Sequence, residues 1–379
     1  LTVRTAGIVL SADVTMQNIK LGFLNTYHNA IFANGHSFTA INVTRADKTR
    51  AVHLFAGNIG KDVKLNFTAN PGTNATFTLQ DSEFGNIYAG GVKESYTGTM
   101  NVDVSDGTTI GTVYGSGAKE RPQSDNWFDT TEPEPPEADT QYTAGAATVT
   151  VDGGMNLTVD GAGAKSMNVI AHSGENRLAL SNVTALTVQQ DKANVVSINE
   201  DAHVTLLNNA ELDLSSAADG TDVKLANLTS SNGTGKLILG KEHLLTIAST
   251  MQGTFALETP GHSQNTSGEA VYDHTYIKAL IGDDATVNFV PHSTQSTMQL
   301  EKITSDDTTW VTWKTTAAST VPTTVNKFEP VKSDLSAGAS TVKDGFIIPV
   351  TWESSVPDSQ TASLSYIPFR YEVVYRGNT

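Results

Sequence analysis

Short runs of alternating apolar and polar residues, separated by turn residues, follow one another along most of this chain. Between residues 5 and 118 they predict strands of only a few residues, such as Phe38–Val43 and Met100–Val104. Pairs such as Asn34-Gly35 and Asp106-Gly107 mark the turns between them. The pattern therefore predicts many short β-strands and no long amphipathic helix.

One motif recurs four times in the first third of the chain. It consists of an aliphatic residue, an aromatic residue, a small residue and a turn of Gly, Asn or Ser. The copies are Ile31-Phe32-Ala33-Asn34-Gly35, Leu54-Phe55-Ala56-Gly57-Asn58, Ile87-Tyr88-Ala89-Gly90-Gly91 and Val113-Tyr114-Gly115-Ser116-Gly117. Their spacing indicates a stacked repeat in which each coil of a parallel β-helix buries its apolar side against the next coil.

Strand alternation allows either the aromatic or the preceding aliphatic residue of each motif to face the core. The small residues beside them suit a tight corner better than a binding surface. We therefore expect the aromatic residues to form an inward ladder and not an exposed platform for a ligand; they are Phe32, Phe55, Tyr88 and Tyr114.

Changes in composition predict four regions. Residues 1–118 form the first β-helix coils, and residues 119–143 form an acidic, proline-rich excursion from one coil or a linker between two stacks, because such a segment cannot lie in a central strand. The β-pattern resumes over residues 144–259. Residues 260–379 have longer strands and more aromatic residues, which predicts a C-terminal β-domain of sandwich type. The predicted fold class is thus all-β: a right-handed parallel β-helix followed by a smaller β-rich domain.

The charge and composition exclude several classes of function. A net charge of −16 without clustered Lys and Arg excludes nucleic acid as a partner, and calcium is the one cofactor that the acidity leaves open. There is no Cys, which excludes disulfides and thiol chemistry and favours a bacterial exterior over a secreted eukaryotic protein. The sequence contains no run of about 18 apolar residues, so no membrane insertion is predicted for this segment.

Catalytic residues are hard to assign. Polysaccharide hydrolysis needs two or three carboxylates close together, and lyases need clustered Asp with calcium and a basic residue. The candidates are Asp103 with Asp106, and Glu200 with Asp201 and Glu211. Most of them lie at turn-forming sites, where an Asp side chain bonds to the local backbone, and the turn interpretation is preferred. The glycine-aspartate pairs at Asp152 and Asp160 lack a complete calcium repeat.

The run from Gly235 to Phe255, with Lys, Thr and Gly between its strands, resembles the β-repeats of large surface proteins of Gram-positive bacteria. The four-part motif resembles the pectin-lyase-like right-handed β-helix regions of such proteins and of autotransporter passengers. The resemblance covers about residues 5–258 and is one of general pattern. It implies an exported rod-like surface protein with a host glycan, mucin or matrix protein as its partner, and it identifies no functional residue.

The leading hypothesis is therefore a non-enzymatic bacterial surface protein, secreted or on the cell surface, that acts as an adhesin or stalk. A polysaccharide lyase or hydrolase on the same scaffold is the main alternative, and a trimeric phage tail spike is another. The oligomeric state is left open. If the chain binds a ligand, the first candidates are aromatic residues that could stack on sugar rings; they are Trp310, Trp313 and Trp352, followed by Trp127 and Phe128 beside the acidic prolines.

Overall fold

The structure is a computed structural model of the 379-residue chain in which every described element is a β-strand. The described residues are 2–3, 7–23, 28–48, 51–59, 73–119, 136–218, 220–240, 244–258, 263–264, 270–271, 275–281, 286–290, 296–305, 308–317, 346–347, 350–356, 359–365 and 367–368. The chain divides into two units, Leu1–Ala202 and His203–Thr379. The all-β class predicted from the sequence is confirmed for the described residues.

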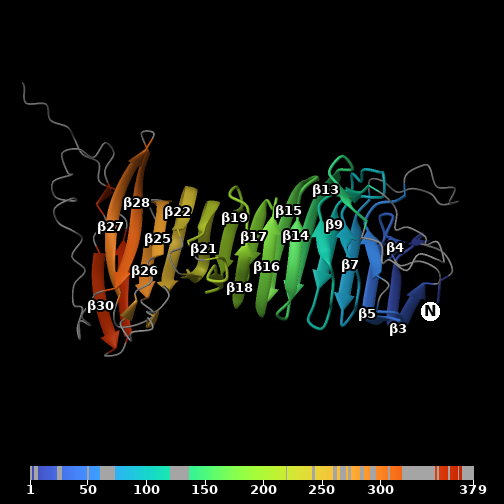
Figure 1. Cartoon of the computed structure of the whole chain (residues 1–379), viewed down its shortest axis with the longest axis horizontal. Coiled ribbons are helices and arrows are strands. Elements are labelled where there is room, and N and C mark those ends of the chain that lie inside the picture. Colours follow the sequence, from blue (N-terminus) through green and yellow to red (C-terminus); the bar gives the residue numbers. More distant parts are fainter. Residues whose placement is uncertain are drawn as a thin grey trace, which may run out of the picture. The chain divides into compact units, whose positions relative to one another are not determined.

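Unit 1 is built from two ladders of parallel strands, between which the chain alternates (Figure 1). The first ladder consists of β1 (Thr2–Val3), β3 (Val14–Phe23), β5 (Ser37–Arg45), β7 (Ala75–Gln80), β9 (Met100–Val104), β13 (Ala144–Asp152), β15 (Ala164–Ser173) and β17 (Ala185–Val188). The second consists of β2 (Gly7–Val9), β4 (His28–Phe32), β6 (Ala51–Phe55), β8 (Ile87–Tyr88), β10 (Thr112–Tyr114), β14 (Asn156–Asp160), β16 (Glu175–Ser181) and β18 (Lys192–Ser197). This pairing is consistent with a β-solenoid.

The register of the second ladder explains the four-part motif. Ile31 pairs with Leu54, Leu54 with Ile87, and Ile87 with Val113. The intervals between the copies of the motif are therefore the lengths of successive coils, and the four motifs occupy equivalent positions in adjacent rungs. Elsewhere a coil is shorter, as between the paired residues Glu175 and Lys192.

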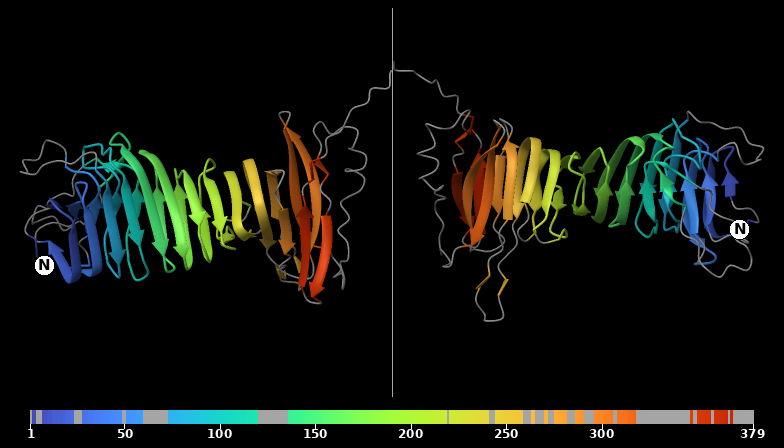
Figure 2. Two further views of the ribbon diagram at one scale, coloured as in Figure 1. Left: turned by 180° about the vertical axis from the view of Figure 1, so that it is seen from behind. Right: turned by 45° about the horizontal axis from the view of Figure 1, so that its top comes forward.

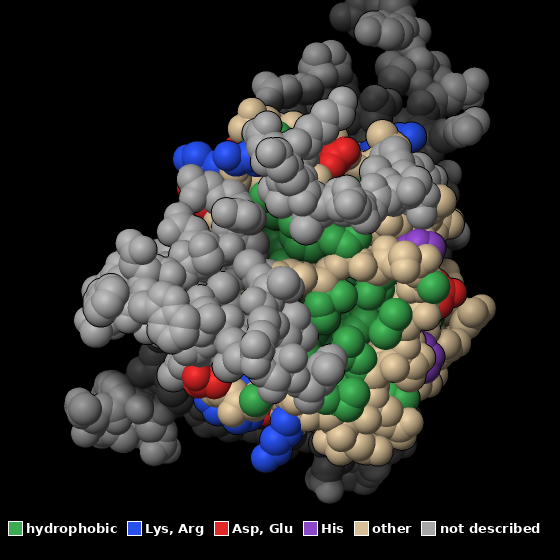
Figure 3. Space-filling view, turned by 90° about the vertical axis from the view of Figure 1, so that its right-hand side faces the viewer, with side chains coloured by type: hydrophobic (Ala, Val, Ile, Leu, Met, Phe, Trp, Pro, Cys, Tyr) green, Lys and Arg blue, Asp and Glu red, His purple; other side chains and the backbone are tan. Residues whose placement is uncertain are grey.

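Alternation along each strand separates the core of unit 1 from its surface. In β7, Ala75, Phe77 and Leu79 are buried, whereas Thr76 is partly exposed and Thr78 is exposed. The predicted strand Phe38–Val43 lies within β5, and the predicted strand Met100–Val104 is β9. Figure 3 looks onto the end of unit 1 that carries its first strands, where hydrophobic side chains gather beside polar ones.

The aromatic residues of the motif form a continuous stack, in which Phe32, Phe55 and Tyr88 are buried and Tyr114 is partly exposed. The ring centroids of Phe32 and Phe55 are 5.0 Å apart, those of Phe55 and Tyr88 4.5 Å, and those of Tyr88 and Tyr114 5.2 Å, with near-parallel planes. We call these four residues the aromatic column. They share a cluster with the buried residues Ala30, Val92 and Ala118.

The expectation that the aromatic residues form an inward ladder is wrong. Strand alternation places them on the same side of the second ladder as Thr112 and Thr158, which is its outer face, and Phe32, Phe55 and Tyr88 are nevertheless buried there. Ile31, Leu54, Ile87 and Val113 are fully buried as well, on the opposite side of the strands. The aromatic column is covered by chain that follows its own strands: Ile59, Val92 and Ala118 are joined by parallel bridges and pack against the column. The column is therefore a second apolar cluster, which lies across the ladder from the aliphatic residues.

Backbone pairing joins the two ends of the acidic, proline-rich segment, and we call these paired ends its root. β11 (Gly117–Ala118) runs antiparallel to β12 (Ala138–Asp139), and the Lys119 N–H donates to the Glu137 carbonyl over 2.9 Å. The Tyr88 hydroxyl donates to the Pro136 carbonyl over 2.5 Å. On either side of this segment, β9 pairs with β13 and β10 with β14. The strands before and after residues 120–135 therefore belong to the same two ladders.

This closed root yields a prediction about stability. Replacing residues 121–134 with a short Gly-Ser turn is expected to change the free energy of unfolding by less than about 1 kcal/mol, because the paired root already holds the two ends together. Urea unfolding of the full chain with and without the segment measures the change. A loss of several kcal/mol would show instead that the segment joins two parts that depend on it.

A second prediction concerns Glu83, which lies beside two cations. Its carboxylate accepts a hydrogen bond from the Lys48 ammonium and lies 3.8 Å from the Arg45 Nε. The hydrogen bond with Lys48, more than the charges of Lys48 and Arg45, lowers the pKa of Glu83 against the opposing effect of burial. The stabilisation is therefore present above the ordinary Glu pKa and is lost as the pH falls through the lowered value.

We expect Glu83→Gln to destabilise the chain by about 1 kcal/mol at neutral pH, and the difference from the native chain to shrink as the pH falls through the ordinary Glu pKa and then through the lowered pKa of Glu83. Urea midpoints measured across this pH range test it. A difference that does not depend on pH would mean that the ion pairs contribute nothing.

Unit 2 begins with parallel strands and ends with antiparallel ones. Its parallel part contains β19 (His203–Leu207), β20 (Glu211–Asp213), β21 (Asp222–Ile238) and β22 (Leu244–Glu258), and β22 also pairs in parallel with β25 (Thr275–Ile281) and β26 (Thr286–Val290). Antiparallel partners follow in β27 (Ser296–Ser305), β28 (Thr308–Ala317), β30 (Val350–Val356) and β31 (Ser359–Ser365). The short pairs are β23 (Ser263–Gln264) with β24 (Ala270–Val271) and β29 (Phe346–Ile347) with β32 (Ile367–Pro368). The sandwich and the four regional boundaries stay predictions.

Candidate functional site

A groove of about 460 Å³ lies on the outer face of the second ladder, over β10, β14, β16 and β18. Figure 2 shows these strands from two further sides. The groove is wholly within unit 1. Its lining residues are Asn86, Ile110, Gly111, Thr112, Asn156, Leu157, Thr158, Arg177, Ala179 and Val196.

The lining follows from strand alternation and register. Asn156 and Thr158 are exposed, while Leu157 and Val159 between and after them are buried. Asn156 pairs with Arg177, and Thr158 pairs with Thr112 on one side and Ala179 on the other. Since neighbouring rungs lie about 4.8 Å apart, these residues form two adjacent rows along the ladder.

Asn86 fixes one edge of the groove through hydrogen bonds to the fold. Its side-chain oxygen accepts from the Thr112 N–H over 3.0 Å, and its amide donates to the Tyr88 hydroxyl over 3.1 Å. Its backbone N–H donates to Nδ1 of the buried His53 over 2.9 Å. The same residue thus links the groove to the aromatic column. The exposed polar residues of the groove are Asn156, Thr158 and Arg177.

The chemistry of the groove is that of hydrogen bonding. Amides, hydroxyls and the Arg177 guanidinium supply donors and acceptors. Among the described lining residues, Arg177 is the one charged side chain, and none is Asp, Glu or His. General acid-base catalysis needs such titratable groups, whereas reversible binding of a hydroxyl-rich ligand does not.

The predicted carboxylates of unit 1 lie away from the described lining of this groove. Asp103 is exposed on the first ladder, between Thr78 and Thr150 in register. Asp106 accepts a hydrogen bond from the Gly107 N–H over 2.8 Å, which confirms the turn interpretation for this residue. Asp201 accepts from the Asn199 amide, and Glu200 is exposed beside it.

In unit 2, Glu211 forms an ion pair with Lys236, with 3.4 Å between Nζ and Oε1. Lys236 is also the residue with which Glu211 pairs in register, so neighbouring rungs place the two charges together. The ion-pair partner of Glu211 is thus a lysine on the adjacent strand of the same ladder.

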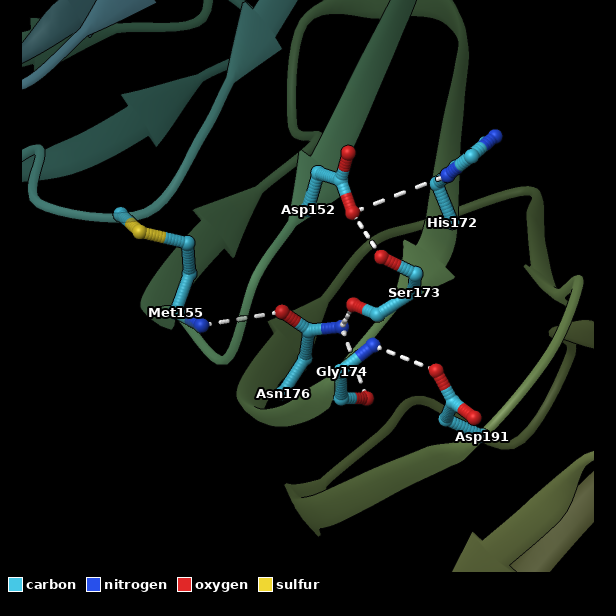
Figure 4. Close-up of polar contacts among 7 residues, drawn as sticks. All are labelled: Asp152, Met155, His172, Ser173, Gly174, Asn176 and Asp191. Atoms are coloured by element: carbon cyan, nitrogen blue, oxygen red, sulfur yellow. Dashed lines mark hydrogen bonds and ion pairs between the residues drawn. The ribbon is translucent and has the colours of Figure 1, made fainter.

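The two glycine-aspartate pairs lie at corners that bond to the next coil. Asp152 accepts a hydrogen bond from the Ser173 hydroxyl and lies 3.7 Å from the His172 Nδ1, and Asp191 accepts from the Gly174 N–H over 2.9 Å (Figure 4). Asp160 accepts from the Ala162 N–H over 3.1 Å and from the Asn182 amide over 2.8 Å. The Asp side chains at these turns thus accept hydrogen bonds from backbone N–H groups and from side chains of the next coil.

The predicted aromatic ligand platforms are not described at the side-chain level. Trp127 and Phe128 lie outside the described residues, and the side chains of Trp310 and Trp313 in β28 and of Trp352 in β30 lie outside them as well. Sequence reasoning missed the groove. Its only signal in the sequence is the run of outward polar residues in Asn156-Leu157-Thr158 and Arg177, whose adjacency depends on the register.

Within the described ranges, no three His, Asp or Glu side chains are grouped so that they could hold a metal ion. Calcium stays a prediction from the sequence. The same ranges contain no helix with the length and apolarity needed to cross a membrane. Comparisons of the chain with protein-family models, with curated proteins and with solved structures found no match.

Proposed function

We propose that this chain is a non-enzymatic surface protein of a bacterium, an adhesin whose unit 1 is a right-handed β-helix of the pectin-lyase-like kind and binds glycans on its outer face. The groove over β10, β14 and β16 is the observation that carries the proposal. It presents the hydrogen-bonding groups that suit sugar hydroxyls and holds them on strands, where the ladder fixes their positions.

The negative charge of the chain agrees with this proposal. A net charge of −16 keeps copies of an extended β-protein apart and soluble. It also disfavours phosphate-rich polymers as partners. A glycan held mainly through hydroxyl groups avoids this repulsion.

A glycan array probed with the full-length chain, followed by calorimetry on the best ligand, tests the proposal. Thr158→Val removes an exposed hydroxyl from the groove and keeps the shape of the side chain, and we expect it to weaken binding about five- to tenfold. Thr150→Val is the matched control, because Thr150 faces outward on the first ladder. Its affinity should equal that of the native chain.

Two results would overturn the proposal. One is failure to bind any glycan, mucin or matrix protein on the array, which would leave only a spacer role. The other is release of reducing ends or unsaturated sugars from a polysaccharide panel, which would make the chain an enzyme.

A further inference from the structure

The groove contains partly exposed apolar side chains beside its polar groups. Ile110 and Val196 are partly exposed branched aliphatic residues at its two ends, and Ala179 lies between larger neighbours on β16. A site built only for sugar hydroxyls does not need them. Partly exposed aliphatic side chains next to convergent polar groups are typical of sites whose ligands have both characters.

The position of Val196 depends on an irregularity of the ladder. Leu178 pairs with Val195, but the next residue, Ala179, pairs with Ser197, so Val196 is the extra residue of a β-bulge. Bulges redirect side chains and are concentrated beside functional sites. Here the bulge adds an aliphatic side chain to the groove next to Ala179.

Ala179 leaves space at this point. Its rung partner on β14 is Thr158, and Arg177 precedes it by two positions on the same face of β16. A methyl-sized side chain between these residues and Val196 leaves room for a small apolar group of the ligand. The polar groups of Asn156, Thr158 and Arg177 lie within about one or two rung spacings of Ala179, and one rung spacing is about 4.8 Å.

We infer that the groove binds glycans that contain N-acetylhexosamine. The methyl of the acetamido group packs on Ala179 and Val196, and its carbonyl oxygen accepts from the Arg177 guanidinium or the Asn156 amide, while the ring hydroxyls bond to Thr158 and the remaining polar groups. This inference rests on the proposed function and adds the class of sugar.

Chitotetraose and cellotetraose test the inference with the full-length chain. The two probes have the same chain length and linkage. They differ at C2 of each ring, where chitotetraose carries an acetamido group and cellotetraose a hydroxyl. Calorimetry should show at least about tenfold tighter binding of chitotetraose. Mucin-type O-glycans and peptidoglycan strands, measured in separate arms, both carry acetamido groups; binding in either arm supports the inference and identifies the source.

Ala179→Ile tests the location. A β-branched residue suits an outward strand position, so the variant should fold, and it fills the space that the acetamido methyl needs. We expect the preference for chitotetraose to fall to less than about twofold. Ala185→Ile, at a partly exposed position of β17 on the first ladder, is the matched control and should keep it. If Ala179→Ile does not fold, Val196→Thr replaces a methyl by a hydroxyl in the same place and should reduce the preference.

Equal affinity for the two tetrasaccharides, or a preference for cellotetraose, would overturn the inference and leave the proposed function intact. A full preference retained by folded Ala179→Ile or Val196→Thr chains would also overturn it, because the acetamido group would then bind elsewhere. Failure to bind any glycan at all would overturn the proposed function as well.

Discussion

Replacing Phe55 by alanine is expected to lower the free energy of unfolding by about 3–5 kcal/mol, the usual cost of removing a buried aromatic side chain. Phe55 is fully buried and stacks on Phe32 on one side and on Tyr88 on the other. Its loss would leave a cavity in the middle of the aromatic column, and both neighbouring rings would lose a stacking partner. Urea unfolding, followed by circular dichroism and by tyrosine fluorescence, measures the change.

Tyr114→Ala is the matched control for this prediction. Tyr114 is partly exposed, and the stacking contact described for it is with Tyr88. We expect about half the loss found for Phe55→Ala. Equal losses at the two positions would contradict the view that the column is a buried stacked cluster, since Phe55 is more buried than Tyr114 and stacks on two rings.

Much of unit 1 could be predicted from sequence because its order is local and repeated. The alternation of apolar and polar residues over 75–79 can be read directly from the sequence. The first residues of the four motifs, Ile31, Leu54, Ile87 and Val113, are rung partners in the structure. Equivalent positions in successive coils meet the same environment, so a repeated environment leaves a repeated pattern.

The groove could not be predicted in this way because it depends on register. Asn156 and Arg177 are neighbours only because the coil between them has one particular length, and Thr112 and Thr158 are neighbours across a longer stretch of chain that includes the acidic segment. Lengthening or shortening either coil by a single position would turn the side chain to the other face. The bulge at Val196 likewise has no signature in the sequence.

The turn at the end of each motif illustrates the same limit. Its Gly residues suggested only a tight corner, yet the structure shows that they let the backbones of adjacent coils approach each other. A Cβ on Gly57 would lie 2.9 Å from the Gly91 nitrogen, and one on Gly117 would lie 2.2 Å from the Gly91 oxygen. The requirement for glycine comes from an adjacent coil, which follows Gly57 and precedes Gly117.

Among the glycines of the motif, Gly91 is the one at which an added Cβ would lie closest to the backbone of another coil. A Cβ built there would lie 2.1 Å from the Asn58 carbonyl oxygen and 2.9 Å from the Asn58 nitrogen. The same carbonyl accepts from the Val92 N–H over 2.8 Å, and the Gly91 carbonyl accepts from the Ala118 N–H over 2.9 Å. Neither coil can move away without breaking the hydrogen bonds that join three rungs.

Gly91→Ala is therefore expected to destabilise the chain by about 3 kcal/mol or more, because overpacking against backbone cannot be relieved by a side-chain rotation. Gly22→Ala is the control, since the added methyl there meets only the Ala46 Cβ, at 3.0 Å, and the loss should stay within about 1 kcal/mol. Urea midpoints of the two variants and the native chain measure the effects. A Gly91→Ala chain as stable as the Gly22→Ala chain would show that the coils have room to separate, and would refute the close stacking to which we attribute the glycine of the motif.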